Sequence, residues 1–109
     1  VKCWGSGVAR REFIYSDDLA NASIFLMQNY DDYGTINVGS AEEISIYDLA
    51  YKVASLVGYR GNIEWDRSQP DGVVSKFLDT TKLSNLGWKP STSLDEGLKL
   101  TYQHYKQEN

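Results

Sequence analysis

Two adjacent arginines, Arg10 and Arg11, are the side chains whose type and setting most directly suggest chemistry. They follow a short loop that carries Gly5 and Gly7, and a guanidinium group can pair bidentately with phosphate oxygens. This arrangement predicts a clamp for a phosphate or a pyrophosphate. The alternative is a solvated pair that bridges to nearby acids, and the residues alone leave both interpretations open. Because neighbouring side chains on a strand point to opposite faces, we expect only one arginine to face a ligand.

Three further side chains could complete a binding site around such an anion. Trp4, at the mouth of the loop, could stack on a base or a sugar ring, although such a tryptophan is more often simply packed. Asp71 could accept hydrogen bonds from hydroxyl groups or a base edge, although its Pro-Asp-Gly setting is also that of an ordinary turn aspartate. Lys76 could contact phosphate or could equally be a solvated lysine. We expect the loop that carries Asp71 and Lys76 to lie opposite the glycine loop.

Two other patterns resemble cofactor or catalytic motifs but fail on their context. Residues 5–10 form half of a dinucleotide fingerprint, but arginine replaces the third glycine and a strand follows instead of a helix. Tyr102 and Lys106 have the Tyr-x-x-x-Lys spacing of short-chain dehydrogenases, but they lie at the end of the chain with no nucleotide-binding unit before them. The first pattern is better explained as a loop with unusual backbone angles, and the second as chance.

Helices and short strands must position these side chains. An apolar strand at 13–15 leads into a helix from residue 16 to about residue 29, capped by Ser16 or Asp17. Capping boxes at Ser45 and Ser93 predict two more helices, of which the first ends at Gly58. Shorter elements are expected as strands at 35–38, 62–66 and 76–79 and as a helix at 80–86. We predict a compact α/β or α+β domain with a small mixed sheet and about four helical segments.

Composition limits the classes of function. The chain has 109 residues and a net charge of −4, so a groove that tracks nucleic-acid phosphates is not expected. One cysteine, Cys3, allows no internal disulfide and no cysteine-rich metal site, and one histidine, His104, excludes most other zinc ligand sets. No apolar run is long enough to span a membrane, and no signal peptide is visible, so we expect the cytoplasm. The chain begins in the middle of a strand at Val1, which indicates a fragment of a longer protein.

Taken together, these residues resemble a known family. The run Trp-Gly-Ser-Gly-x-x-x-Arg-Glu-Phe-Ile, continued by Asp-Asp-Leu-Ala, resembles the start of the C-terminal half of extended short-chain dehydrogenase/reductases that act on nucleotide sugars. The resemblance continues through residues 36–39, 83–90 and 93–98 and covers essentially the whole chain. The Gln-Pro-Asp-Gly loop at 69–72, followed by Lys-Phe-Leu-Asp at 76–79, is similar to the GDP-L-fucose synthase family.

The resemblance implies one part of a two-step enzyme. Such enzymes epimerise GDP-4-keto-6-deoxy-D-mannose at C3 and C5 and then reduce it with NADPH. It also implies that NADP(H) and the catalytic Ser-Tyr-Lys set belong to an N-terminal Rossmann domain that is absent from this chain, so that residues 1–109 form a substrate-binding domain. Neither Cys3 nor His104 matches the family's catalytic cysteine and histidine. We therefore expect no catalytic, cofactor-binding or metal-binding residue here, and no activity from this fragment alone.

Matched by position, Trp4, Arg11, Asp71 and Lys76 are the substrate-binding residues that the resemblance implies. Arg11, rather than Arg10, corresponds to the family's arginine. The implied partners are a GDP-sugar and the chain's own Rossmann domain, with a homodimer expected for the full-length enzyme. One alternative is the substrate domain of another nucleotide-sugar epimerase, dehydratase or reductase, and another is a non-catalytic module that binds a nucleotide sugar or serves assembly.

Overall fold

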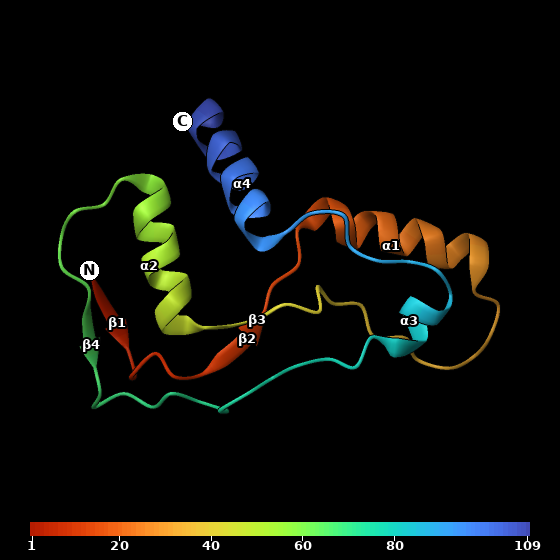
Figure 1. The fold of residues 1–109 in the computed structure, drawn as a ribbon, viewed down its shortest axis with the longest axis horizontal. Helices are drawn as coiled ribbons and strands as arrows, with labels where there is room; N and C mark the ends of the chain where they lie inside the picture. The colour runs from red at the N-terminus through yellow and green to blue at the C-terminus, as the bar shows by residue number, and fades with distance from the viewer.

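The computed structural model describes all of residues 1–109 and contains four helices and four three-residue strands (Figure 1). In chain order the elements are β1 (Lys2–Trp4), β2 (Arg10–Glu12), α1 (Ser16–Asn29), β3 (Glu43–Ser45), α2 (Ile46–Val57), β4 (Glu64–Asp66), α3 (Thr81–Asn85) and α4 (Leu94–Glu108). The predicted mixed α/β class and the four helical segments are confirmed. None of the helices combines the length and the apolar character that a membrane crossing requires.

The strands form two separate ladders. β1 pairs with β4 in parallel, with Cys3 opposite Trp65, and β2 pairs with β3 antiparallel, with Arg11 opposite Ile44. The strands expected at 13–15, 35–38 and 76–79 do not form. A β-branched or aromatic run becomes a strand only where a ladder of hydrogen bonds pairs it with another backbone. The single backbone bond from Lys76 to the Arg10 carbonyl does not make such a ladder.

The two helices predicted from capping boxes begin as expected. The Ser45 side chain accepts a hydrogen bond from the backbone N–H of Asp48 at 3.0 Å, and Ser93 does the same for the N–H of Glu96 at 3.2 Å. Gly58 ends α2 in the left-handed region, with φ of 73°. The predicted cap of α1 was wrong: Tyr15 is the N-cap residue, and no side chain caps this helix.

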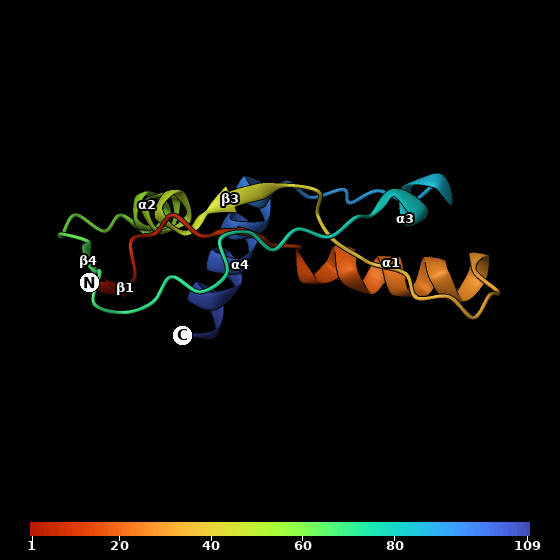
Figure 2. The same ribbon diagram turned by 90° about the horizontal axis from the view of Figure 1, so that it is seen from below.

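The predicted compactness was also wrong. The molecule measures 49 × 34 × 17 Å, and its radius of gyration is 16.5 Å, compared with about 13 Å for a compact domain of this length. One end holds β1, β4 and α2, the other holds α1 and α3, and β2 and β3 lie between them (Figure 1). Turned by 90°, the molecule is a flat plate (Figure 2). Ala9, Ala22 and Leu83 are the only fully buried apolar residues, so these 109 residues do not enclose a core of their own.

An uncovered apolar face runs along α2. It forms an open hollow of about 410 Å³ between this helix and the chain around β1 and β4. All of its lining residues are apolar or aromatic: Val1, Cys3, Ile46, Leu49, Ala50, Val53, Ala54, Val57, Tyr59 and Ile63. A contiguous apolar surface of this kind is normally a contact surface in the complete protein.

The buried carboxylate of Asp18 links α1 to the segment that leads into α4. The residue is 2% exposed. Its carboxylate accepts hydrogen bonds from the Ser91 hydroxyl and from the Thr92 backbone N–H, both at 2.9 Å. Its neighbour in the same helical turn, Asp17, is exposed and has no such partners. Asp18 therefore joins two segments of the chain, whereas the sequence pattern indicated only a favourable interaction with the helix dipole.

We expect Asp18→Ala to lower the free energy of unfolding by about 2–3 kcal/mol, because the Ser91 hydroxyl and the Thr92 N–H lose a buried, charged acceptor. Asp17→Ala, the matched control, should cost about 0.3–1 kcal/mol through the helix dipole alone. Chemical denaturation of the two variants measures the difference. Equal losses would show that the buried contacts of Asp18 contribute nothing specific.

Candidate functional site

Two loops that are distant in the sequence lie side by side. The first spans residues 5–9, between Trp4 at the end of β1 and β2, which carries Arg11, and the second spans residues 67–76, after β4, and carries Asp71 and Lys76 (Figure 1). Asp71 joins them: its carboxylate accepts a hydrogen bond from the Ser6 N–H at 2.6 Å and another from the Ser6 hydroxyl at 2.8 Å. The structure thus places the loop of Asp71 and Lys76 against the glycine loop, as the sequence suggested.

The glycines allow this close approach. Gly5 and Gly7 have φ of 85° and 81°, in the left-handed region that favours glycine. A Cβ atom at Gly5 would collide with the Asp71 carboxylate, and one at Gly7 would lie 2.8 Å from Cβ of Tyr47 and 2.9 Å from the Trp65 ring. Behind Gly7, the Tyr47 and Trp65 rings stack with centroids 5.6 Å apart. The loop is packed against protein on this side, which leaves no cradle for a dinucleotide.

Hydrogen bonding from Ser6 also lowers the pKa of Asp71. The backbone N–H of Ser6, followed by its hydroxyl, lowers the pKa of Asp71 below the ordinary value of 3.8, with smaller contributions from the Gly7 N–H and the charge of Arg67. An aspartate with the ordinary pKa is already ionised at neutral pH, and the lowered pKa keeps Asp71 charged at a more acidic pH as well. A carboxylate has about four lone-pair positions, so Asp71 can anchor the loops and still accept a further hydrogen bond at its exposed side.

The two arginines have separate environments, as expected for neighbours on a strand. Arg11 is half-buried, and its Nη1 donates to the carbonyl oxygens of Val73 and Arg10, each at 2.7 Å. No carboxylate pairs with it, because the four salt bridges of the structure involve other residues. Backbone carbonyls therefore hold this guanidinium in place without neutralising its charge. Such a group can bind an anion with little further ordering.

Arg10 is instead held by an acid that the sequence analysis missed. Its Nε lies 3.2 Å from Oε1 of Glu43, and its Nη2 donates to the Glu43 carbonyl at 3.4 Å. Neither arginine bridges to Glu12 or Asp17, the acids nearest to them in the sequence. Glu43 comes beside Arg10 only through the pairing of β2 with β3, and three-residue strands carry too short a pattern for the sequence to reveal it.

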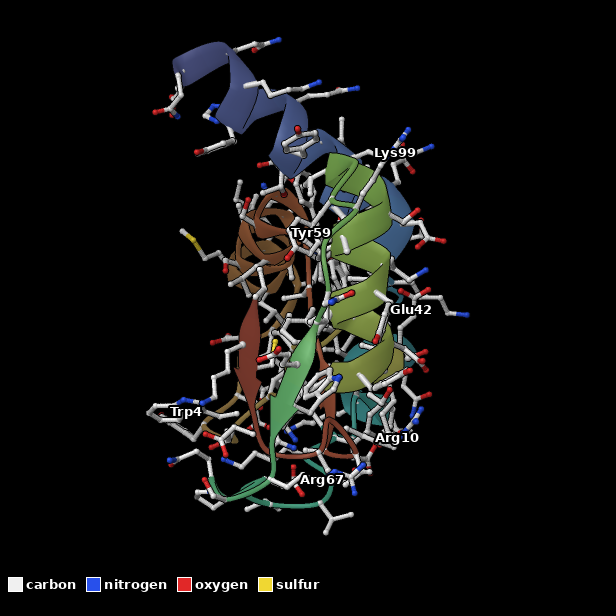
Figure 3. The ribbon with its side chains drawn as sticks, turned by 90° about the vertical axis from the view of Figure 1, so that its left-hand side faces the viewer. Trp4, Arg10, Glu42, Tyr59, Arg67 and Lys99 are labelled. Carbon is white, nitrogen blue, oxygen red and sulfur yellow. The ribbon has the colours of Figure 1, made fainter.

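Trp4 and Lys76 are both exposed. Trp4, which is 72% exposed, extends away from the end of β1 on one side of the flat molecule, whereas Arg10 lies on the other side (Figure 3). Lys76 is joined to the first loop through its backbone N–H, which donates to the Arg10 carbonyl at 3.3 Å. None of the four site residues lines one of the main hollows of the molecule.

The Tyr-x-x-x-Lys pattern lies elsewhere. The Lys106 ammonium sits 4.7 Å from the centre of the Tyr102 ring on α4, near the C-terminus and away from the two loops (Figure 1). Helical spacing alone explains this contact.

The sequence of the chain is similar to those of known proteins. The model of the NAD dependent epimerase/dehydratase family matches residues 1–39. GDP-L-fucose synthase 1 of Arabidopsis thaliana is 44% identical to the chain over 105 residues, which is 96% of the chain and 32% of that protein.

The chain is similar in sequence to proteins of the NAD dependent epimerase/dehydratase family. Solved structures show the same similarity. A GDP-L-fucose synthetase from Naegleria fowleri bound to NADP has a TM-score of 0.92 at 28% identity, covering 98% of this chain and 34% of that one. A GDP-6-OMe-4-keto-L-xylo-heptose reductase from C. jejuni has a TM-score of 0.90 at 38% identity, covering 100% of this chain and 34% of that one. This chain thus spans about a third of the length of the relatives it matches.

The hydrogen bonds to Asp71 give a pH-dependent prediction. Because its pKa is lowered in the folded state, the carboxylate stabilises the joint between the loops above the ordinary aspartate range, and this stabilisation is lost as the pH falls through the lowered pKa. In Ser6→Ala the hydroxyl donor is gone, so the pKa of Asp71 should move back toward 3.8. Carboxyl-carbon NMR titration measures this shift. The same Asp71 midpoint in both proteins would contradict the assignment.

Proposed function

We propose that this chain is the GDP-sugar-binding domain of an enzyme that epimerises GDP-4-keto-6-deoxy-D-mannose at C3 and C5 and reduces it with NADPH to GDP-L-fucose. The observation that carries the proposal is Arg11, an unneutralised guanidinium fixed by backbone carbonyls where two loops meet. The similarity to proteins named GDP-L-fucose synthase supports the choice of substrate.

Four residues would bind the substrate in this proposal. Arg11 and Lys76 supply positive charge for the pyrophosphate, and only the planar fork of Arg11 can pair with it bidentately. Trp4 offers an apolar wall for a ring, and its exposure leaves that face free. Asp71 accepts hydrogen bonds from hydroxyl groups or a base edge on the oxygen positions that Ser6 does not use.

NADP(H) would bind to a different part of the enzyme. The space behind Gly5 and Gly7 is filled by Asp71, Tyr47 and Trp65, so the glycine loop leaves no room for a dinucleotide there. No group of three or more histidine, cysteine, aspartate or glutamate side chains is placed to hold a metal ion. We therefore assign substrate binding to this chain and the chemical step to a Rossmann domain elsewhere in the protein.

The uncovered apolar face of α2 supports that division of labour. A Rossmann domain of the same protein would cover the hollow beside α2 and supply the missing wall of the substrate site. The relatives are about three times as long as this chain, which leaves ample length for such a domain. A homodimer, if formed, would then use surfaces of that other domain.

The complete enzyme, this chain joined to its Rossmann domain, should oxidise NADPH when given GDP-4-keto-6-deoxy-D-mannose, and residues 1–109 alone should not. Absorbance at the NADPH band follows both reactions. UDP- and dTDP-linked keto-sugars serve as controls, and preferential turnover of either would favour the related epimerase, dehydratase or reductase. Binding of GDP-sugars by the complete protein without turnover would instead favour a non-catalytic module.

In the complete enzyme, Arg11→Ala should raise the KM for the GDP-sugar about 10- to 100-fold, the equivalent of a lost hydrogen bond to a charged group. The KM for NADPH should stay nearly unchanged, because Arg11 does not reach that cofactor. Arg11→Lys should recover part of the loss, since charge returns without the bidentate fork. Arg60→Ala, at an exposed position beyond α2, is the control. Equal losses for both ligands would count against the assignment.

A further inference from the structure

We propose that Glu43 is a positioning residue that fixes the two loops relative to each other and reserves Arg11 for the ligand. This inference rests on the proposed function of the site. Glu43 was absent from the predicted site residues, and it lies on β3, outside both loops. Its role follows from two contacts, from Arg10 and Ser75, that converge on one carboxylate oxygen of Glu43.

The first step is the geometry of the ladder. In the β2–β3 register, Arg10 is opposite Ser45, so Glu43 is the diagonal neighbour of Arg10 on the same face. Its Oε1 lies 3.2 Å from Nε of Arg10 and accepts a hydrogen bond from the Ser75 hydroxyl at 2.8 Å. One carboxylate oxygen thus joins β2, β3 and the second loop.

The second step is the path from Glu43 to Arg11. Ser75 forms an isolated parallel bridge with Arg10. On either side of it, the Arg10 N–H donates to the Val74 carbonyl at 2.8 Å and the Lys76 N–H donates to the Arg10 carbonyl at 3.3 Å. This short stretch also carries the Val73 carbonyl that accepts from Arg11 Nη1. By holding Ser75, Glu43 fixes the carbonyl that aims the Arg11 guanidinium and the backbone that carries Lys76.

The third step is charge. The side chains of Arg10 and Glu43 are 46% and 30% exposed, so their ion pair contributes little to global stability. Its effect is local: Arg10 is neutralised and tied to β3, while Arg11 next to it keeps an unpaired charge. Without Glu43, a second free guanidinium would lie beside the ligand site, and the loop would lose its side-chain attachment at Ser75.

The kinetic test uses Glu43→Gln in the complete enzyme. We expect the KM for the GDP-sugar to rise about 3- to 10-fold, with kcat and the KM for NADPH within about twofold of wild type, because positioning affects substrate binding and not the chemical step. Ser75→Ala added to Glu43→Gln should raise the KM for the GDP-sugar further, because the glutamine amide oxygen can still accept a hydrogen bond from the Ser75 hydroxyl. Glu42→Gln is the matched control: it removes the neighbouring charge, whose carboxylate contacts the Leu94 N–H and neither loop.

A second measurement does not depend on turnover. Amide hydrogen exchange of the complete enzyme should show faster exchange at Arg10 and Lys76 in Glu43→Gln than in wild type or Glu42→Gln, with the amides of α2 unchanged. Unchanged exchange at these two amides would overturn the proposal whatever the substrate is. A parallel fall in kcat and in affinity for both ligands would overturn it too, because it would indicate general destabilisation.

The two proposals can fail separately. If Arg11→Ala raises the KM for the GDP-sugar and Glu43→Gln does not, the role of Glu43 is wrong and the proposed function stands. If the enzyme does not act on GDP-sugars at all, the proposed function fails, and the exchange measurement still decides whether Glu43 fixes the loops.

Discussion

The joint between residues 4–11 and residues 66–76 is the constraint on which the rest of the site depends. It brings together segments about sixty residues apart through the Ser6–Asp71 hydrogen bonds, the parallel pairing of β1 with β4, and the backbone bonds around Arg10. Closing so long a loop costs conformational entropy. Many small interactions offset that cost, and together they give Arg11 a fixed position beside Lys76 and Asp71.

The loop sequence is fitted to this joint more than to any ligand. The Asp71 carboxylate fills the space that a side chain at position 5 would need. Tyr47 and Trp65 fill the corresponding space at Gly7. The glycines therefore let two protein segments approach each other, a different use from the glycines that admit a pyrophosphate in a dinucleotide fold. Arg11 contributes the free positive charge, and the glycines contribute the surface on which it is held.

The flat shape and the open apolar face of α2 follow from the same lack of an enclosed core. The interactions between the two loops are mostly hydrogen bonds, which order the site but do not enclose an apolar core. The hydrophobic contribution that stabilises an ordinary domain is unused along α2, where the apolar side chains remain uncovered. In the proposed enzyme, one covering domain would bury this face and complete the substrate site in the same step.

The sequence by itself determined the local features of this protein. The caps at Ser45 and Ser93 and the left-handed stop at Gly58 depend on contacts within a few residues, and they formed where predicted. Local pattern also placed the four helices and separated Arg10 from Arg11 by strand alternation. Its predictions of a compact shape, of strands at 13–15, 35–38 and 76–79, and of the cap of α1 were wrong. Each of these features depends on contacts with segments that are distant in the sequence.

Only the tertiary structure determined which distant side chains bind to each other. Glu43 beside Arg10, Asp71 against Ser6, and Asp18 buried under Ser91 and Thr92 join residues 33, 65 and at least 73 positions apart. Sequence spacing says nothing about such pairs, because they arise from how loops and short strands are brought together. The sequence could name the arginine and its neighbours as candidates, but the pairing of distant backbones determined which guanidinium is neutralised and which stays free.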